Sequence, residues 1–244
     1  MNNLAVSEQF FSIQGEGPSA GTPALFLRCR GCNLLCGQTR EYDPACTWRC
    51  DTIDVWKKGA LWSIPELVSV WEKKGWLNAL ESTAHLVVTG GEPLLQQSAL
   101  MHLFKALKKR VQKDVFIEIE TNGTVMPNKE LLSMISQCNV SPKLSNSGIT
   151  LDQRIKPAVI LAFRNEASTI FKIVINSEQD LTELRKTLIE PYGIAANKVF
   201  LMPGQDNAKQ YLKYEKQIKQ YCQYYNFEFS PRLQITHWDK AVGV

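Results

Sequence analysis

The sequence contains no apolar run of about 18 residues, the length that a membrane-spanning helix requires. Residues 1–4 also lack the basic and apolar regions of a signal peptide. Both absences predict a cytoplasmic protein without a membrane partner. In such a reducing compartment, clustered cysteines bind metal more often than they form disulfides.

Strong charge is also absent, because the net charge is only +4 at pH 7 across 244 residues. This charge is too mild to predict direct binding of nucleic acid, and it is equally compatible with an anionic small substrate. The hydrophobic content of 44% and the charged content of 21% are ordinary for a globular protein. We therefore expect a single domain over residues 1–244.

Short β-branched or apolar runs alternate with helical patterns along the chain, which predicts an α/β fold with a largely parallel sheet. The expected strands are 24–30, 85–89, 114–120, 138–141, 169–175, 198–202 and 227–230. The expected helices are 63–71, which a capping box of Ser63 and Glu66 begins, 98–110, 181–188 after Ser177, and 207–225.

Unusual loops follow several of these strands, at 29–52, 90–93, 121–124, 142–143 and 203–205. A parallel sheet gathers the loops after its strands at one rim, where such proteins bind ligands. We therefore expect these loops to form one site.

Five of the seven cysteines lie within residues 29–50, a density found nowhere else in the chain. Such thiolates select zinc or iron–sulfur centres. Structural zinc commonly uses two Cys-x-x-Cys knuckles, a pattern that this cluster does not contain. Cys29 falls within an expected strand, so we interpret it as a buried structural residue.

The segments Gly31-Cys32-Asn33-Leu34-Leu35-Cys36 and Cys50-Asp51-Thr52 resemble the cluster loop of radical S-adenosylmethionine (SAM) enzymes. That superfamily is marked by Cys-x3-Cys-x2-Cys, whose three thiolates hold a 4Fe–4S cluster with one iron open to SAM. Here position 39 is threonine, and residues 37–49 separate Cys36 from Cys50. The resemblance implies an insertion at 37–49 within an expanded cluster loop, 29–52. Either Cys36 or Cys46 supplies the middle ligand, and we favour Cys36.

The segment Ser12-Ile13-Gln14-Gly15-Glu16-Gly17-Pro18, followed by Gly21-Thr22-Pro23-Ala24 and Arg28, is similar to the N-terminus of the 7-carboxy-7-deazaguanine synthase family. The resemblance implies a partial TIM-type barrel and a radical SAM lyase of queuosine-type 7-deazaguanine biosynthesis. Such an enzyme converts 6-carboxy-5,6,7,8-tetrahydropterin to 7-carboxy-7-deazaguanine and releases ammonia. It also implies a 4Fe–4S cluster, SAM and Mg²⁺ as cofactors, a pterin substrate, a flavodoxin- or ferredoxin-type electron donor, and a homodimer.

The same resemblance assigns roles residue by residue and requires no conventional catalytic side chain. The implied metal ligands are Cys32, Cys36, Cys50 and, for Mg²⁺, Thr52. The implied cofactor-binding residues are Arg49, Asp51, Gly91, Glu92, Glu120, Asn122, Ser141, Pro142, Lys143, Met202 and Gln205. The implied substrate-binding residues are Ile13, Gln14, Gly15, Glu16, Arg28, Thr89, Gln234 and Val244.

The chemistry of the side chains agrees with these roles, since Gln14 and Glu16 offer acceptors for pterin N–H groups and Arg28 offers a fork for a carboxylate. Two other interpretations stay open: an activase for a glycyl-radical enzyme, and a zinc module without enzymatic activity. The sequence leaves undecided whether the product serves tRNA or DNA modification.

Overall fold

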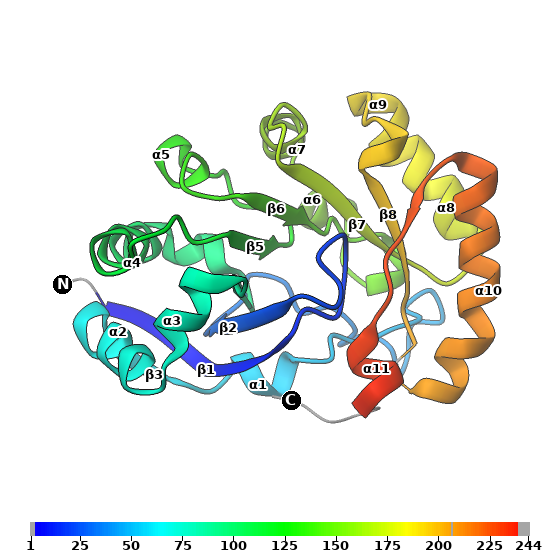
Figure 1. Cartoon of the computed structure of the whole chain (residues 1–244). Coiled ribbons are helices and arrows are strands. Elements are labelled where there is room, and N and C mark those ends of the chain that lie inside the picture. The colour runs from blue at the N-terminus through cyan, green and yellow to red at the C-terminus, as the bar shows by residue number, and fades with distance from the viewer. Residues whose placement is uncertain (1–2, 206, 239–244) are drawn as a thin grey trace.

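The computed structural model describes residues 3–205 and 207–238, which form one nine-stranded sheet with helices outside it (Figure 1). The order of the strands across the sheet is β3-β1-β2-β4-β5-β6-β7-β8-β9. The strands are β1 (Asn3–Ile13), β2 (Pro23–Cys29), β3 (Ala60–Ser63), β4 (His85–Gly90), β5 (Ile117–Thr121), β6 (Gln137–Val140), β7 (Thr169–Ile175), β8 (Val199–Pro203) and β9 (Glu228–Phe229).

The sheet is parallel from β2 to β9, as the sequence predicts, and only its β1 edge is antiparallel. All seven expected strands are present, although β5 begins later than expected and β9 has only two residues. β1 and β3 were not predicted. β1 pairs with both β2 and β3, and it leads directly into the Gln14–Glu16 segment.

The helices include all four that the sequence predicts. The α-helices are α1 (Ile53–Trp56), α2 (Ile64–Lys73), α3 (Trp76–Ser82), α4 (Gln97–Arg110), α5 (Lys129–Leu132), α6 (Leu151–Arg154), α7 (Pro157–Arg164), α8 (Glu178–Leu184), α9 (Glu190–Tyr192), α10 (Ala208–Tyr225) and α11 (Leu233–Trp238). Short turns of other helix types are η1 (Pro93–Gln96), η2 (Ser145–Ser147), η3 (Arg185–Ile189, a π-helical turn) and η4 (Ala196–Lys198).

Side chains start two of these helices as predicted. Ser63 and Glu66 form the reciprocal capping box of α2, and Ser177 does the same with Asp180 at α8. No helix in the described part of the chain is both long enough and apolar enough to cross a bilayer.

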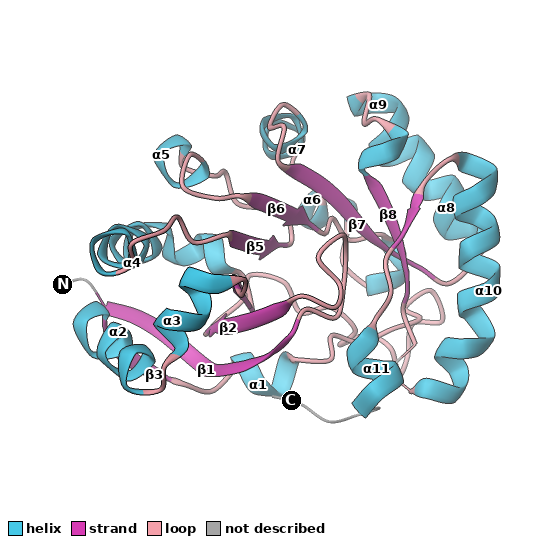
Figure 2. Cartoon of the chain, viewed as in Figure 1, coloured by secondary structure: helices cyan, strands magenta, loops and turns pink. Residues whose placement is uncertain are grey.

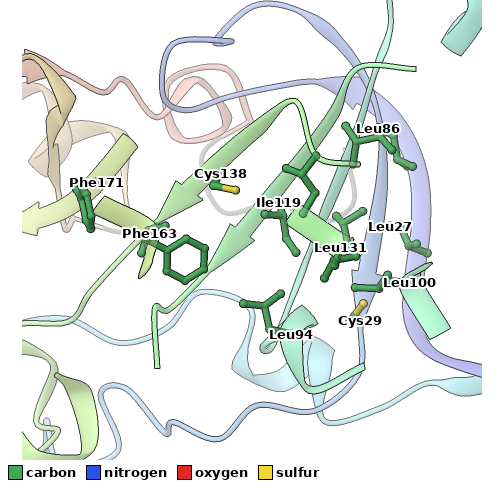
Figure 3. Close-up of a cluster of buried hydrophobic side chains, with 14 of the residues drawn as sticks. Leu27, Cys29, Leu86, Leu94, Leu100, Ile119, Leu131, Cys138, Phe163 and Phe171 are labelled. Atoms are coloured by element: carbon green, nitrogen blue, oxygen red, sulfur yellow. The ribbon is translucent and has the colours of Figure 1, made fainter. Parts of the chain in front are cut away.

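One face of the sheet is apolar and carries the main core. Leu27, Leu86, Ile119 and Phe171 point from β2, β4, β5 and β7 into a cluster with helix residues such as Leu100 (Figure 3). All five side chains are essentially buried. Because side chains alternate along a strand, burying this face directs their neighbours to the opposite face.

The opposite face is largely polar at the carboxyl ends of the strands. Thr89, Glu118, Glu120, Asn139 and Lys172 alternate with the apolar positions of β4 to β7 and bond to one another there. The long segment between β2 and α1 lies at the same end and contains no helix or strand (Figure 2). The fold therefore places a polar wall and a cysteine-rich loop around one space.

Candidate functional site

A cavity of about 540 Å³ opens at the carboxyl ends of the strands, a volume within the usual range for small-ligand pockets. The predicted site residues that line it are Ile13, Gln14, Gly15, Glu16, Arg28, Cys32, Cys36, Arg49, Cys50, Asp51, Thr52, Thr89, Gly91, Glu120, Asn122, Ser141, Lys143, Met202 and Gln234. The expected convergence of the loops is therefore confirmed.

Three predicted residues do not line the cavity: Glu92, Pro142 and Gln205. Val244 lies outside the described residues. Gln205 instead donates its amide to Asn176 Oδ1 and accepts from Arg232 through its backbone oxygen.

Glu92 is fully buried behind the cavity wall. Its carboxylate accepts hydrogen bonds from Leu94 N (3.0 Å), Thr121 Oγ1 (2.8 Å) and Asn122 N (2.7 Å). Burial raises the pKa of Glu92, and these donors oppose that rise. The structure thus uses Glu92 to join the loops after β4 and β5, and does not bring its carboxylate to the cavity.

The thiols of Cys32, Cys36 and Cys50 share one wall of the cavity. The two ends of the inserted segment 37–49 meet at this wall, because Cys50 N donates a hydrogen bond to Cys36 O at 3.2 Å. Gly37 packs directly against Arg49, where an added Cβ would lie 2.3 Å from Arg49 Cα. Cys36 and Cys50 are therefore neighbours in space in spite of the residues inserted between them.

Cys46 lies outside this arrangement. It is buried but does not line the cavity, and its thiol donates to the backbone oxygen of Trp48 at 3.6 Å. Burial raises the pKa of Cys36 to about 12, while the nearby Lys143 cation opposes the rise. As a free thiol Cys36 is therefore protonated at neutral pH, so a metal has to displace its proton.

The cluster loop is docked on the rest of the site through close backbone contacts. An added Cβ on Gly91 would lie 1.9 Å from Gly31 O, so only glycine permits this approach. The amide of Asn122 donates to Asn33 Oδ1 at 2.9 Å and lies 3.9 Å from Cys32 Sγ. The inserted segment is fixed as well, since Trp48 Nε1 donates to Asn146 Oδ1 at 2.8 Å.

The lining of the cavity also contains a chain of alternating charges. Thr89 Oγ1 donates to Glu120 Oε2 at 2.8 Å, and Lys172 Nζ lies 3.3 Å from Glu120 Oε1 and 2.5 Å from Glu16 Oε2. Lys172 and Arg232 hold the pKa of Glu16 at about 2, although burial acts strongly in the opposite direction. The carboxylate of Glu16 is therefore ionised at any neutral pH.

Gln14 holds the loop that carries Glu16. Its amide nitrogen lies 3.4 Å from both Glu118 Oε2 and Glu120 Oε1, and its Oε1 accepts from the backbone of Gly15 at 2.8 Å. Both glutamates face the same side of β5, because residues two positions apart in a strand share a face. Glu118 is also paired with His85 Nδ1 at 2.5 Å.

Arg232 is a site residue that sequence reasoning missed. Its guanidinium donates to Asp51 Oδ2 (2.7 Å), to Gln205 O (2.6 Å) and to Glu16 Oε1 (3.4 Å). Gln234 Nε2 donates to the same oxygen of Glu16 at 2.6 Å, while Gln234 Oε1 is buried without a protein partner. One arginine thus joins the cluster loop, the loop after β8 and the Gln14–Glu16 segment.

Lys172 was missed too, because it lies within an apolar strand pattern. The signal available in the sequence was a lysine at an otherwise buried position, which requires a charged partner. Arg28 has such a partner in Glu8 (2.7 Å) and still faces the cavity, whereas Arg49 is half exposed and pairs with Asp54 at 3.1 Å.

Thr52 precedes α1, but its hydroxyl does not cap that helix and lies 3.5 Å from Cys50 Sγ. Lys143 also lines the cavity. It donates to Ser141 Oγ at 2.9 Å, and its ammonium lies 5.6 Å from the centre of the Trp48 ring. The site therefore combines three thiols, of which only Cys36 is fully buried, with a neighbouring cation and a charged pocket, an arrangement suited to a soft metal centre and a small ligand in an α/β protein.

Known proteins are similar to this chain along nearly its whole length. A 7-carboxy-7-deazaguanine synthase of Pyrobaculum aerophilum is 32% identical over 243 residues, covering 98% of this chain and 97% of its own length. Another from Halobacterium salinarum is 27% identical, covering 98% of this chain and 91% of its own. The crystal structure of QueE from Escherichia coli has the same fold, with a TM-score of 0.66, 22% identity and 93% of both chains covered. No protein-family model matches the chain.

The chain belongs to the 7-carboxy-7-deazaguanine synthase family.

Proposed function

We propose that this chain is a radical SAM lyase that converts 6-carboxy-5,6,7,8-tetrahydropterin to 7-carboxy-7-deazaguanine with release of ammonia, in queuosine-type biosynthesis. The observation that carries the proposal is the cavity, which is lined both by three thiols and by a set of carboxylates, an amide and an arginine. A radical enzyme needs both sets, because the reactive cofactor and the substrate have to lie in one enclosed space.

The thiol wall fits a 4Fe–4S cluster held by Cys32, Cys36 and Cys50. In the described part of the chain, no three cysteine, histidine, aspartate or glutamate side chains converge on the position of a single ion. Structural zinc requires such convergence of four ligands, whereas thiolates contact a multi-iron cluster from different sides. The family to which the chain belongs also supports a cluster over zinc.

SAM would lie beside the cluster, against Gly91, Asn122, Ser141 and Lys143, with Met202 also lining the cavity, in the same apolar cluster as Cys36. When bound, the cluster supplies an electron and SAM supplies the group that removes a hydrogen atom from the substrate. The Lys143 ammonium is suited to the SAM carboxylate, since among the described residues it donates a hydrogen bond to Ser141 alone.

The chain's own residues orient the pterin and exclude water. Arg28 offers guanidinium donors beyond the one that pairs with Glu8, and these suit the substrate carboxylate. Glu16, Glu120 and the unpartnered Gln234 Oε1 offer acceptors for the N–H groups of the ring. The pairing of Glu16 with two cations keeps it an acceptor at every pH of interest.

Mg²⁺ belongs to the same proposal, with the Thr52 hydroxyl as its protein ligand. Magnesium prefers oxygen ligands and keeps several waters, so one threonine beside a cavity is a sufficient protein contribution. The hydroxyl of Thr52 lines the cavity and is not used as a helix cap, which supports this role.

We also propose that residues 1–244 are one radical SAM domain whose sheet is an incomplete TIM-type barrel. The polar inner face and the helices outside support this description. The proposal includes a homodimer in the cytoplasm and a flavodoxin- or ferredoxin-type protein as the electron donor.

The direct test is to incubate the anaerobically reconstituted protein with carboxytetrahydropterin, SAM and a chemical reductant. We expect mass spectrometry to detect 7-carboxy-7-deazaguanine and an equal amount of ammonia, and neither product when SAM is omitted. If SAM is cleaved only in the presence of a glycyl-radical partner protein, the activase interpretation is correct and the proposal is wrong.

The Cys36→Ala and Cys46→Ala variants test the choice of the middle ligand. We expect Cys36→Ala to lose SAM cleavage and most of its iron, because it removes a thiol from the cavity wall. Cys46→Ala is the matched control and should keep both, since its thiol faces the Trp48 backbone. A Cys36→Ala protein with a full cluster and full activity would reverse the assignment.

The magnesium proposal is tested by titrating Mg²⁺ into wild type, Thr52→Ser and Thr52→Ala. Turnover should rise with Mg²⁺ in wild type and in Thr52→Ser, which keeps the hydroxyl, and far less in Thr52→Ala. An equal response of all three proteins would exclude Thr52 as the ligand.

A further inference from the structure

Lys172 is a buried cation in the wall of the cavity, with its side chain only 5% exposed. It lies in the middle of β7, between the apolar residues Phe171 and Ile173, which face the main core. Since isolated buried charges are strongly unfavourable, the fold has to provide anionic partners at this position.

Two carboxylates provide that pairing, and they come from segments far apart in the sequence. Lys172 Nζ lies 2.5 Å from Glu16 Oε2 in the loop after β1 and 3.3 Å from Glu120 Oε1 at the end of β5. Asn139 of the intervening strand β6 does not compete with Lys172 for these two carboxylates, because its amide donates to Glu118 at 3.0 Å. Lys172 therefore fixes the distance between two carboxylates whose backbone segments do not pair with each other in the sheet.

Both carboxylates keep acceptor capacity for a ligand. An ionised carboxylate has about four lone-pair sites. Protein donors reach Glu120 from Lys172, Gln14 and Thr89, and they reach Glu16 from Lys172, Arg232 and Gln234. An ammonium group also has three donors, of which Lys172 uses two here, so the third is available to the cavity.

We propose that Lys172 is a positioning residue of the substrate site: it holds Glu16 and Glu120 ionised and at a fixed spacing, so that both accept N–H groups of one bound heterocycle. This inference rests on the proposed function and adds to it the residue that sets the geometry of the two acceptors. A purely structural ion pair gives no reason for its cation to face the cavity.

Lys172→Met tests the proposal, because methionine keeps most of the side-chain length and removes the charge. We expect the KM for the pterin to rise at least about tenfold, as when one partner of a buried charge pair is removed from a binding site. The KM for SAM and the iron content should stay at wild-type values. Lys172→Arg should recover most of the affinity because it restores the cation.

The pH profile provides a readout that a structural role would not change. The charged and titratable groups that face Glu16 are Lys172, Arg232, Glu120 and Tyr211. Lys172 is one of the two cations that lower the pKa of Glu16 to about 2, so its loss raises that pKa. The acid limb of kcat/KM should therefore move to higher pH in Lys172→Met and stay in place in Lys172→Arg.

The control is Lys105→Met, which breaks an exposed ion pair with Glu130 far from the cavity and should change none of these values. If Lys172→Met does not fold, Lys172→Gln replaces it, because glutamine keeps a hydrogen-bond donor for the two carboxylates and removes only the charge. This variant should show the raised KM for the pterin.

Wild-type values of the pterin KM and of the acid limb in a folded Lys172 variant would overturn the inference and leave the proposed function intact. An equal loss of SAM affinity and of iron would also overturn it, since Lys172 would then support the whole site. Absence of pterin turnover in the wild-type protein itself would overturn both proposals together.

Discussion

The ion pairs of Glu16 are the interaction on which the rest of the site depends. This carboxylate is anchored by Lys172 from β7 and by Arg232 from the segment before α11. Arg232 also pairs with Asp51 at 2.7 Å, and Asp51 directly follows Cys50 in the cluster loop. A short run of charges therefore connects the substrate wall to the cluster loop, and it closes the cavity between segments that are far apart in the sequence.

The same principle explains how an inserted segment is tolerated inside the cluster loop. Residues 37–49 leave and return at one point, where Cys50 N bonds to Cys36 O and Gly37 packs on Arg49. Trp48 lies close to this point, and its bond to Asn146 then fixes the returning end of the insertion against the loop after β6. The insertion lengthens the loop without separating the thiols that flank it.

Much of this arrangement could be predicted from the sequence because it depends on local patterns. β7 has the predicted bounds, 169–175, since β-branched and aromatic residues dominate it. The loops meet at one rim because parallel strands require it. The capping boxes at Ser63 and Ser177 also depend only on residues three positions apart.

What could not be predicted depends on pairing between distant segments. Lys172 looks like an irregularity in an apolar strand until Glu16 and Glu120 are placed beside it. Arg232 has no local signature, and Glu92 follows two glycines as a cofactor contact would, although it serves to join two loops. β1 was missed because its residues alternate less regularly in burial than those of the buried strands.

The central claim is that Cys32, Cys36 and Cys50 hold a 4Fe–4S cluster with one iron open to SAM. The most direct measurement is electron paramagnetic resonance of the reduced, anaerobically reconstituted protein, together with its metal content. The account predicts about four iron atoms per chain and a cluster signal that changes when SAM is added. A colourless protein with one tetrahedral zinc per chain, or a cluster signal that SAM leaves unchanged, would contradict it.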